Sequence, residues 1–357
     1  MNKKRIEKVA QLLQENKLPQ LLVSSPYSIF YLTGKWIFPG ERMVTLLVND
    51  QGEATLYAAR LFALPGTVDM PLVEYDDTDD CVAVLSSGLK SGLVGVEKTW
   101  ASHFTLRLMD ARSDIKPVIG SHMIDMARLC KDEDEVALMK ESSHRNDQTI
   151  EAAIARLRPG MTEREGADIY LEEAKAHGAT GPSFEPLVCY GENCAEPHHS
   201  SDDVRRLREG DAIILDVGLS YKNYCSDMTR TVFLGSASDE QKRVYDLVCR
   251  ANAAGRAAVR PGVPCREVDR AARKVIEDAG YGKYFIHRTG HGIGLEVHEY
   301  PDISSTSEEI CRPGMCFSVE PGIYLPGKFG VRVEDLVTVT EDGAVTMNEV
   351  PRELRIL

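Results

Sequence analysis

Two stretches of the chain repeat each other, and this internal repeat limits the possible folds more than any other feature of the sequence. The segment LRPGMTERE (157–165) matches VRPGVPCRE (259–267), and LREGDAIILDVG (207–218) matches CRPGMCFSVEPG (311–322). In each copy, the second match runs as an apolar strand into an acidic residue. We therefore expect two copies of one helix–helix–hairpin unit, related by a pseudo-two-fold repeat.

Each copy also carries a second acidic residue after the strand. Asp216 is followed by Asp227 in YCSDMTRTVFL, and Glu320 is followed by Glu334 in VRVEDLVTV. A hairpin that turns at Tyr221-Lys222 would place Asp216 opposite Asp227, and a turn at the Pro-Gly-Lys sequence would place Glu320 opposite Glu334. Cross-strand neighbours have Cβ atoms about 4.5–5.5 Å apart, so the two hairpins would present four carboxylates to one centre.

Four ionised carboxylates at one centre repel each other, so they must take up protons or bind cations. Two divalent cations would balance them, and a carboxylate can bridge metals about 3.5–4 Å apart. His291, in the glycine-rich sequence HRTGHGIG, is the candidate imidazole ligand. A single Asp in a hairpin or a single His in a loop is usually uninformative, so the prediction depends on their coincidence in the repeat. Oxygen ligands with one imidazole favour Mn²⁺, with Co²⁺ or Zn²⁺ as alternatives.

The first third of the chain follows a different pattern, in which strand-like apolar runs alternate with helical segments. From Asp132 onward, a long helical segment with an acidic first turn begins, and Thr162 with Glu165 predicts a capping box at the start of the next helix. We therefore predict an α/β (α+β) fold class, with a small N-terminal α/β domain at 1–127 and a second domain at 128–357.

Composition excludes several classes of function. The net charge of −13 disfavours binding to nucleic acid or to anionic membrane surfaces. No apolar run approaches the roughly 20 residues of a membrane span, and the N-terminus lacks the apolar core of a secretion signal. The nine cysteines are odd in number and have no CxxC spacing, which favours the reduced cytoplasmic compartment.

Three further histidines and one arginine flank the acidic strands. His198 lies in AEPHHSSDD, while His287 and His298 lie on either side of His291. Any one of them alone is usually a satisfied polar residue, but their gathering around one motif favours roles at the metal site. Arg332 shares a strand face with the last acidic residue of the repeat. It either forms an ion pair with the acidic cluster or binds a substrate carboxylate.

Five motifs, in this order, resemble those of the pita-bread metallopeptidase family, and within it the Xaa-Pro peptidases (prolidase and aminopeptidase P). The motifs are ILDVG, SDMTRT, HRTGHGIGLEVHE, VEPGIY and VRVEDLV. The N-terminal part with YLTG is similar to the creatinase/prolidase-like domain that accompanies the catalytic domain in this family. The resemblance covers nearly the whole chain. It implies a C-terminal pita-bread catalytic domain, hydrolysis of Xaa-Pro dipeptides, and a homodimer.

The resemblance also implies a role for each candidate metal ligand. Asp216 would bind one metal ion with both oxygens, and His291 and Glu320 would bind the other. Asp227 and Glu334 would bridge the two ions, and a hydroxide between them would attack the scissile carbonyl.

The remaining candidates would act on the substrate. Glu320 is similar to a residue that shuttles a proton, and His298 to one that stabilises the tetrahedral intermediate. His198 would contact the substrate near the scissile nitrogen, and His287 with Arg332 would bind its C-terminal side. Because the Pro-His step of the family is doubled here, His199 is an alternative to His198.

Other functions remain open at this level. An aminopeptidase P, which acts on longer peptides with Pro second, is hard to separate from a dipeptidase. Methionine aminopeptidase resembles only the C-terminal half, and a creatinase-like hydrolase works without metals. A non-catalytic pita-bread binding module typically lacks several ligands, whereas all five candidate ligands are present in this chain.

Overall fold

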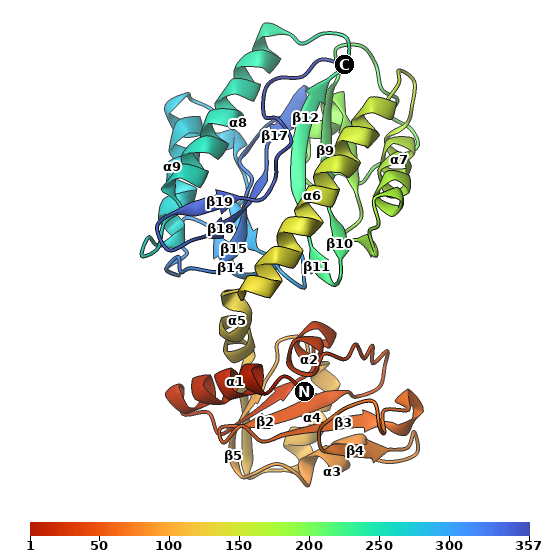
Figure 1. The fold of residues 1–357 in the computed structure, drawn as a ribbon, viewed down its shortest axis with the longest axis vertical. Coiled ribbons are helices and arrows are strands. Elements are labelled where there is room, and N and C mark those ends of the chain that lie inside the picture. The colour runs from red at the N-terminus through yellow and green to blue at the C-terminus, as the bar shows by residue number, and fades with distance from the viewer. The chain divides into compact units, whose positions relative to one another are not determined.

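A six-stranded mixed sheet organises the first unit of the chain, Met1–Arg128 (Figure 1). The structure, a computed structural model, describes residues 1–357, and Leu129–Leu357 form a second unit. The strands are β1 (Gln20–Val23), β2 (Thr45–Asn49), β3 (Ala54–Ala59), β4 (Leu72–Tyr75), β5 (Gly92–Val96) and β6 (Ile115–Ile119). The helices are α1 (Lys3–Glu15), α2 (Pro26–Thr33), α3 (Cys81–Ser86), α4 (Ser102–Ala111) and α5 (Ser121–Leu129), with a 3₁₀ turn at Arg60–Phe62.

The strand order of this sheet is β4-β3-β2-β1-β5-β6. Every residue of β1 is buried, as expected for a central strand whose two faces are both covered. The YLT part of the YLTG motif forms the end of α2, and Gly34 stops that helix in the left-handed conformation, with a φ of +73°. None of the helices in either unit has the length and apolar composition that a membrane crossing requires.

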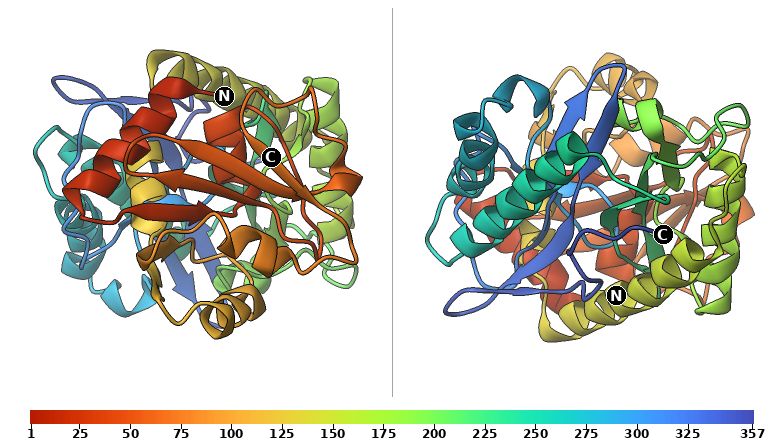
Figure 2. Two further views of the ribbon diagram at one scale, coloured as in Figure 1. Left: turned by 90° about the horizontal axis from the view of Figure 1, so that it is seen from below. Right: turned by 90° about the horizontal axis from the view of Figure 1, so that it is seen from above.

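The second unit contains two helix pairs with strands between them (Figures 1 and 2). The helices are α6 (Glu133–Arg156), α7 (Glu163–Ala176), α8 (Asp239–Ala258) and α9 (Cys265–Asp278), with 3₁₀ turns at Gly191–Ala195 and Gly282–Tyr284. The strands of the first copy are β7 (Gly181–Pro182), β8 (Leu187–Tyr190), β9 (Ala212–Val217), β10 (Leu219–Tyr221), β11 (Tyr224–Cys225) and β12 (Met228–Phe233). Those of the second are β13 (Gly290–Gly292), β14 (Glu299–Ile303), β15 (Cys316–Val319), β16 (Gly322–Leu325), β17 (Phe329–Arg332), β18 (Asp335–Val339) and β19 (Ala344–Thr346).

The capping boxes explain where the first helix pair begins. Asp132 caps α6 with Glu135, and the predicted box of Thr162 with Glu165 starts α7. The main sheets have the orders β12-β9-β8 and β14-β13-β15-β18-β19. Each copy of the repeat therefore forms a helix pair with its own sheet.

Alternation along β9 directs its acidic residue toward the second copy. Ile213 and Leu215 pack in the core formed with α6 and α7. Ile214, on the opposite face, packs in the core that contains residues of α8 and β17, including Val331. Because side chains on a strand alternate between its faces, Asp216 shares the face of Ile214 and points between the two copies.

The first hairpin turns one residue later than the sequence analysis expected. Lys222 and Asn223 occupy the turn between β10 and β11, with φ values of +47° and +76°. Moving a turn by one residue shifts the register by two, so Asp216 pairs with Thr229 and not with Asp227. The expectation was wrong because a two-residue turn with two positive φ values favours Asn, which selects Asn223. A shift of two residues preserves the face, and Asp227 still lines the same cavity as Asp216.

The second hairpin has the predicted register. Val319 pairs with Asp335, and Gly322 pairs with Arg332. Glu320 and Glu334 therefore face each other between these two ladders.

Candidate metal centre

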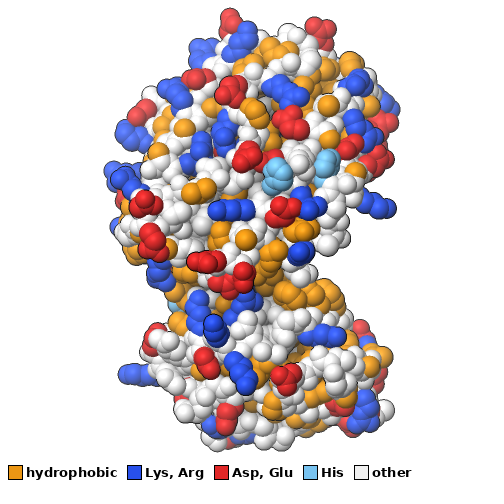
Figure 3. All heavy atoms as spheres, in the orientation of Figure 1, with side chains coloured by type: hydrophobic (Ala, Val, Ile, Leu, Met, Phe, Trp, Pro, Cys, Tyr) orange, Lys and Arg blue, Asp and Glu red, His pale blue; other side chains and the backbone are white.

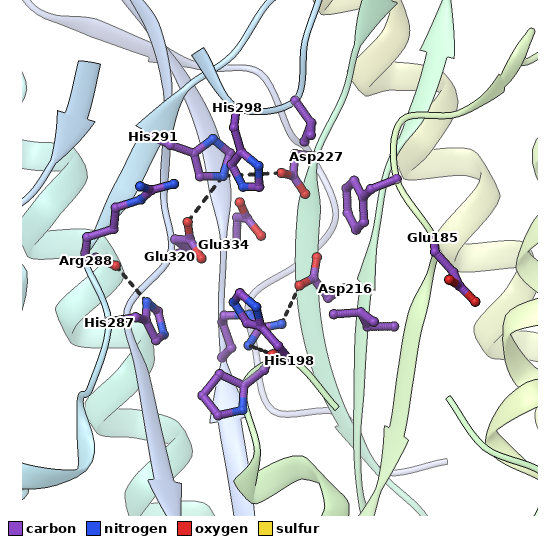
Figure 4. A pocket seen from close by; sticks show the side chains of 15 residues that line it. Glu185, His198, Asp216, Asp227, His287, Arg288, His291, His298, Glu320 and Glu334 are labelled. Atoms are coloured by element: carbon purple, nitrogen blue, oxygen red, sulfur yellow. Dashed lines mark hydrogen bonds and ion pairs between the residues drawn. The ribbon is translucent and has the colours of Figure 1, made fainter. Parts of the chain in front are cut away.

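A cavity of about 610 Å³ lies in the second unit, and both copies of the repeat contribute to its walls. Figure 4 shows the acidic side chains and histidines converging on it. All nine side chains selected from the sequence line this cavity: His198, Asp216, Asp227, His287, His291, His298, Glu320, Arg332 and Glu334. In Figure 3, histidine side chains reach the surface of this unit beside acidic and basic side chains.

Glycines let the strand that carries His291 pass close to its neighbours. A Cβ on Gly290 would lie 1.9 Å from the carbonyl oxygen of Ser318, and a Cβ on Gly292 would lie 2.5 Å from that of Tyr300. Neither position can hold a side chain while β13 remains paired with β14 and β15. The glycine pattern therefore fixes the place of the imidazole.

His291 lies among the acidic residues. Its Nε2 is 3.4 Å from Glu320 Oε1 and 3.7 Å from Asp227 Oδ2. One ligand atom from each of His291, Asp227 and Glu334 fits within 4.8 Å of the others. His291 Nδ1 is 3.1 Å from the Gly292 carbonyl oxygen. Because a carbonyl only accepts, Nδ1 carries the proton and Nε2 presents its lone pair to the carboxylates.

The ionisation of the cluster also favours a cation. Burial, followed by the charge of His298, lowers the pKa of His291 to about 3, so the imidazole is neutral near pH 7. Burial, reinforced by Asp216, raises the pKa of Asp227 well above its usual value. Burial and the charge of Asp227 raise the pKa of Glu334 in the same way.

Two buried oxygens test whether these residues fit a metal. Asp227 Oδ1 and Glu334 Oε1 are buried and have no hydrogen-bond partner, which is costly for acceptors removed from water. A divalent cation between the carboxylates and the neutral imidazole would satisfy both oxygens and offset the repulsion. The residues therefore fit a site for divalent metal, as the sequence predicted.

We expect the metal-free protein to lose stability as the pH rises. The pKa of Glu334 is raised on folding, so above about 4.3 the unfolded chain loses a proton that the folded chain keeps. The free energy of unfolding therefore falls as the pH rises from about 4.3 towards the raised pKa of Glu334 in the folded chain. Urea unfolding of chelator-treated wild type and Glu334→Gln at about pH 5 and about pH 8 measures this contribution. The free energy of unfolding of the variant, relative to that of wild type, should be higher at about pH 8 than at about pH 5. The same difference between variant and wild type at both pH values would contradict the prediction.

Arg332 is buried and committed to protein atoms. Its guanidinium Nη2 donates to Asp216 Oδ2, and Nη1 donates to Tyr324 Oη at 2.9 Å and to the Pro197 carbonyl at 3.2 Å. Nε donates to Thr229 Oγ1 at 3.2 Å. Four of its five N–H groups thus have protein acceptors, so in this structure Arg332 holds the carboxylate of Asp216 in place.

His287 continues this hydrogen-bonded chain. Its Nδ1 is 2.7 Å from the Arg288 carbonyl oxygen, and its Nε2 is 2.8 Å from Tyr324 Oη. Burial, and then the charge of Arg332, lower the pKa of His287 to about 3. The neutral ring therefore donates a hydrogen bond from Nδ1 to the Arg288 carbonyl and accepts one at Nε2 from the Tyr324 hydroxyl.

The doubled histidine step separates into two environments. His198 lines the cavity, whereas His199 Nε2 is 3.2 Å from Glu163 Oε2 and 2.9 Å from Asn193 Nδ2. Glu163 is fully buried and also accepts the backbone N–H of Tyr190 at 2.7 Å. His199 is thus held by Glu163 and Asn193 outside the cavity, and His198 is the histidine of this pair that lines the cavity.

Sequence reasoning missed several residues of the site, and three of them bear on its chemistry. Thr229 donates to Glu334 Oε2 at 2.7 Å, and Tyr324 joins Arg332 to His287. Thr229 lies two residues after Asp227 and Tyr324 lies four residues after Glu320, so a search at even spacings from the ligands could have found both. Arg288, which lines the cavity, had no such signal.

Comparisons with known proteins agree with this geometry. The sequence pattern of metallopeptidase family M24 matches residues 137–341, which is more than half of the chain. The chain belongs to metallopeptidase family M24. A creatinase/prolidase N-terminal domain matches residues 5–130.

Relatives of this M24 chain match it from end to end. A Xaa-Pro dipeptidase from Pyrococcus furiosus is 33% identical, covering 99% of each chain. The solved structure of a dipeptidase from Pyrococcus horikoshii is 37% identical, with a TM-score of 0.93 over 99% of this chain and 100% of that one. A prolidase from Thermococcus sibiricus is 35% identical, with a TM-score of 0.94 over the full length of both. The predicted α/β fold class, with a pita-bread second half, is confirmed.

Proposed function

We propose that this metallopeptidase is a Xaa-Pro dipeptidase. The observation that carries the proposal is the convergence of four carboxylates and one neutral imidazole on a single cavity, in a chain similar over its full length to a prolidase. The expected product is free proline, and the substrate class is short peptides with proline in the second position. Because an Xaa-Pro bond has no N–H, it calls for a site that does not depend on that donor.

The metal ligands proposed here are the five residues Asp216, Asp227, His291, Glu320 and Glu334. Two divalent ions, preferably Mn²⁺ with Co²⁺ or Zn²⁺ as alternatives, would polarise the scissile carbonyl and make hydroxide available near neutral pH. Arg332 supports this set by holding Asp216, and Thr229 supports it by donating to Glu334.

The protein's own groups handle protons and orientation. In the metal-free protein, burial raises the pKa of Glu320 to about 7, although Arg332 opposes the rise. We assign Glu320 to accept a proton at a carboxylate oxygen and return it to the leaving nitrogen. We assign His298 to the developing oxyanion and His198 to the region of the scissile nitrogen. His287 and Arg332 form the wall that faces the C-terminal side of the substrate.

A substrate panel tests the proposal. The metal-loaded protein should cleave Xaa-Pro dipeptides much faster than the matched Xaa-Ala dipeptides, and faster than Xaa-Pro-Yaa tripeptides. Release of free proline, measured by chromatography, is the readout. Faster cleavage of the tripeptides would assign the chain to aminopeptidase P, and no cleavage of any Xaa-Pro bond would contradict both assignments.

Three further expectations belong to this proposal. We infer a domain boundary at residues 127 and 128 and, from the family resemblance, a homodimer. We also infer the cytoplasm as the compartment, supported by the nine cysteines, all of which are free thiols.

A further inference from the structure

Arg332 and His287 have few N–H groups left to donate hydrogen bonds to a substrate. Four N–H groups of Arg332 already reach protein acceptors. Both ring nitrogens of His287 are also engaged, one with Tyr324 and one with the Arg288 carbonyl. A substrate carboxylate that displaced Asp216 from Arg332 would disturb a metal ligand. We therefore expect another residue of the cavity wall to bind the free C-terminal carboxylate of a substrate.

Arg288 has the properties that this group needs. It lines the cavity, and Figure 4 shows its side chain extending toward the part of the cavity that holds His291. Its guanidinium makes one ion pair, from Nη1 to Asp302 Oδ1 at 2.7 Å. No other protein atom accepts from this guanidinium, so most of its N–H groups remain available.

The pair with Asp302 can be exchanged at little cost. The Arg288 side chain is 38% exposed and that of Asp302 is 60% exposed, and ion pairs at such positions contribute little net free energy. Asp302 pairs with His291 in the register of β13 and β14, so it lies on the strand beside the metal centre. Asp302 thus holds Arg288 at the cavity wall until another carboxylate replaces it.

We propose that Arg288 binds the C-terminal carboxylate of the dipeptide substrate, in exchange for Asp302. The assignment rests on the proposed Xaa-Pro activity and adds to it a residue that selects for substrate length. A dipeptide places its carboxylate one residue beyond the scissile bond, where the guanidinium can bind both oxygens. A longer or amidated peptide offers only a neutral carbonyl at that point, which gives a weaker hydrogen bond.

The test compares an Xaa-Pro dipeptide with the same dipeptide carrying a C-terminal amide, using metal-loaded enzyme. Wild type should prefer the free carboxylate. Arg288→Gln should lose roughly 10–100-fold in kcat/KM on the dipeptide, mainly through KM, and much less on the amide. Asp302→Asn removes the competing carboxylate, and it should lower KM for the dipeptide more than for the amide.

Arg250→Gln is the matched control, because Arg250 forms a surface ion pair with Asp246 at 2.9 Å on α8 and does not line the cavity. This variant should keep the wild-type preference. Competitive inhibition by proline and by prolinamide gives a readout independent of turnover, and Arg288→Gln should no longer favour proline.

The outcomes separate the two claims. If Arg288→Gln keeps the wild-type preference, or if wild type does not distinguish the two substrates, the assignment of Arg288 is overturned while Xaa-Pro cleavage stands. If metal-loaded wild type cleaves no Xaa-Pro bond, the proposed function is overturned and the assignment falls with it.

Discussion

Glu334→Gln is expected to release bound metal and to lower kcat/KM on an Xaa-Pro dipeptide by roughly 10³-fold or more. Glu334 is buried, its Oε1 has no protein partner, and its Oε2 accepts from Thr229. An amide keeps the shape of the side chain but removes the negative charge that Glu334 would offer to a divalent metal. Elemental analysis of the purified variant, together with steady-state kinetics, measures both effects.

Glu135→Gln provides the control for loss of a buried carboxylate. Glu135 is buried and accepts the hydroxyl of Tyr224 at 2.7 Å, but it lies outside the cavity. Gln can also serve in the capping box of α6, so this variant should keep metal and activity. If Glu334→Gln retained the full metal content and wild-type kinetics, the carboxylate cluster would not be the metal site.

His298→Ala is expected to lower kcat and kcat/KM by similar factors, roughly 10²–10³ each, with little change in KM. The His298 ring meets the His291 ring edge-on, with centroids 4.2 Å apart. Burial, followed by the charge of Arg288, lowers the pKa of His298, so the ring is neutral at pH 7 and has one N–H to donate. A donor used mainly in the transition state affects turnover more than ground-state binding.

His144→Ala controls for the loss of an imidazole, because His144 is exposed on α6 and hydrogen bonds with Gln148. Metal content must be measured for both variants. A His298→Ala enzyme with full metal and unchanged kcat would show that His298 does not stabilise the oxyanion.

The internal repeat carried most of the site prediction, because it placed acidic residues at equivalent ends of strands. The match of Asp216 to Glu320 predicted that the two copies present their acidic residues to one centre. The packing of Ile214, which shares a strand face with Asp216, agrees with that prediction. The register of the second hairpin followed from its Pro-Gly turn. These features depend on residues close together in the sequence, so they can be predicted from the sequence alone.

The rest of the site depends on contacts between segments far apart in the chain. Arg332 fitted two roles in the sequence, and only the packing of β9 and β16 around it shows that its donors are occupied by Asp216 and Tyr324. The contact between Arg288 and Asp302 requires β13 and β14 to be paired. The first hairpin could have been placed correctly, because Asn223 signals a turn with positive φ.

Counting metal ions per chain tests the central claim most directly. Native mass spectrometry of chelator-treated protein titrated with Mn²⁺ should show two ions bound per chain, and dipeptide cleavage should rise from zero as the second site fills. Saturation at one ion, or full activity in a sample verified to be metal-free, would contradict a dinuclear centre built from the two copies of the repeat.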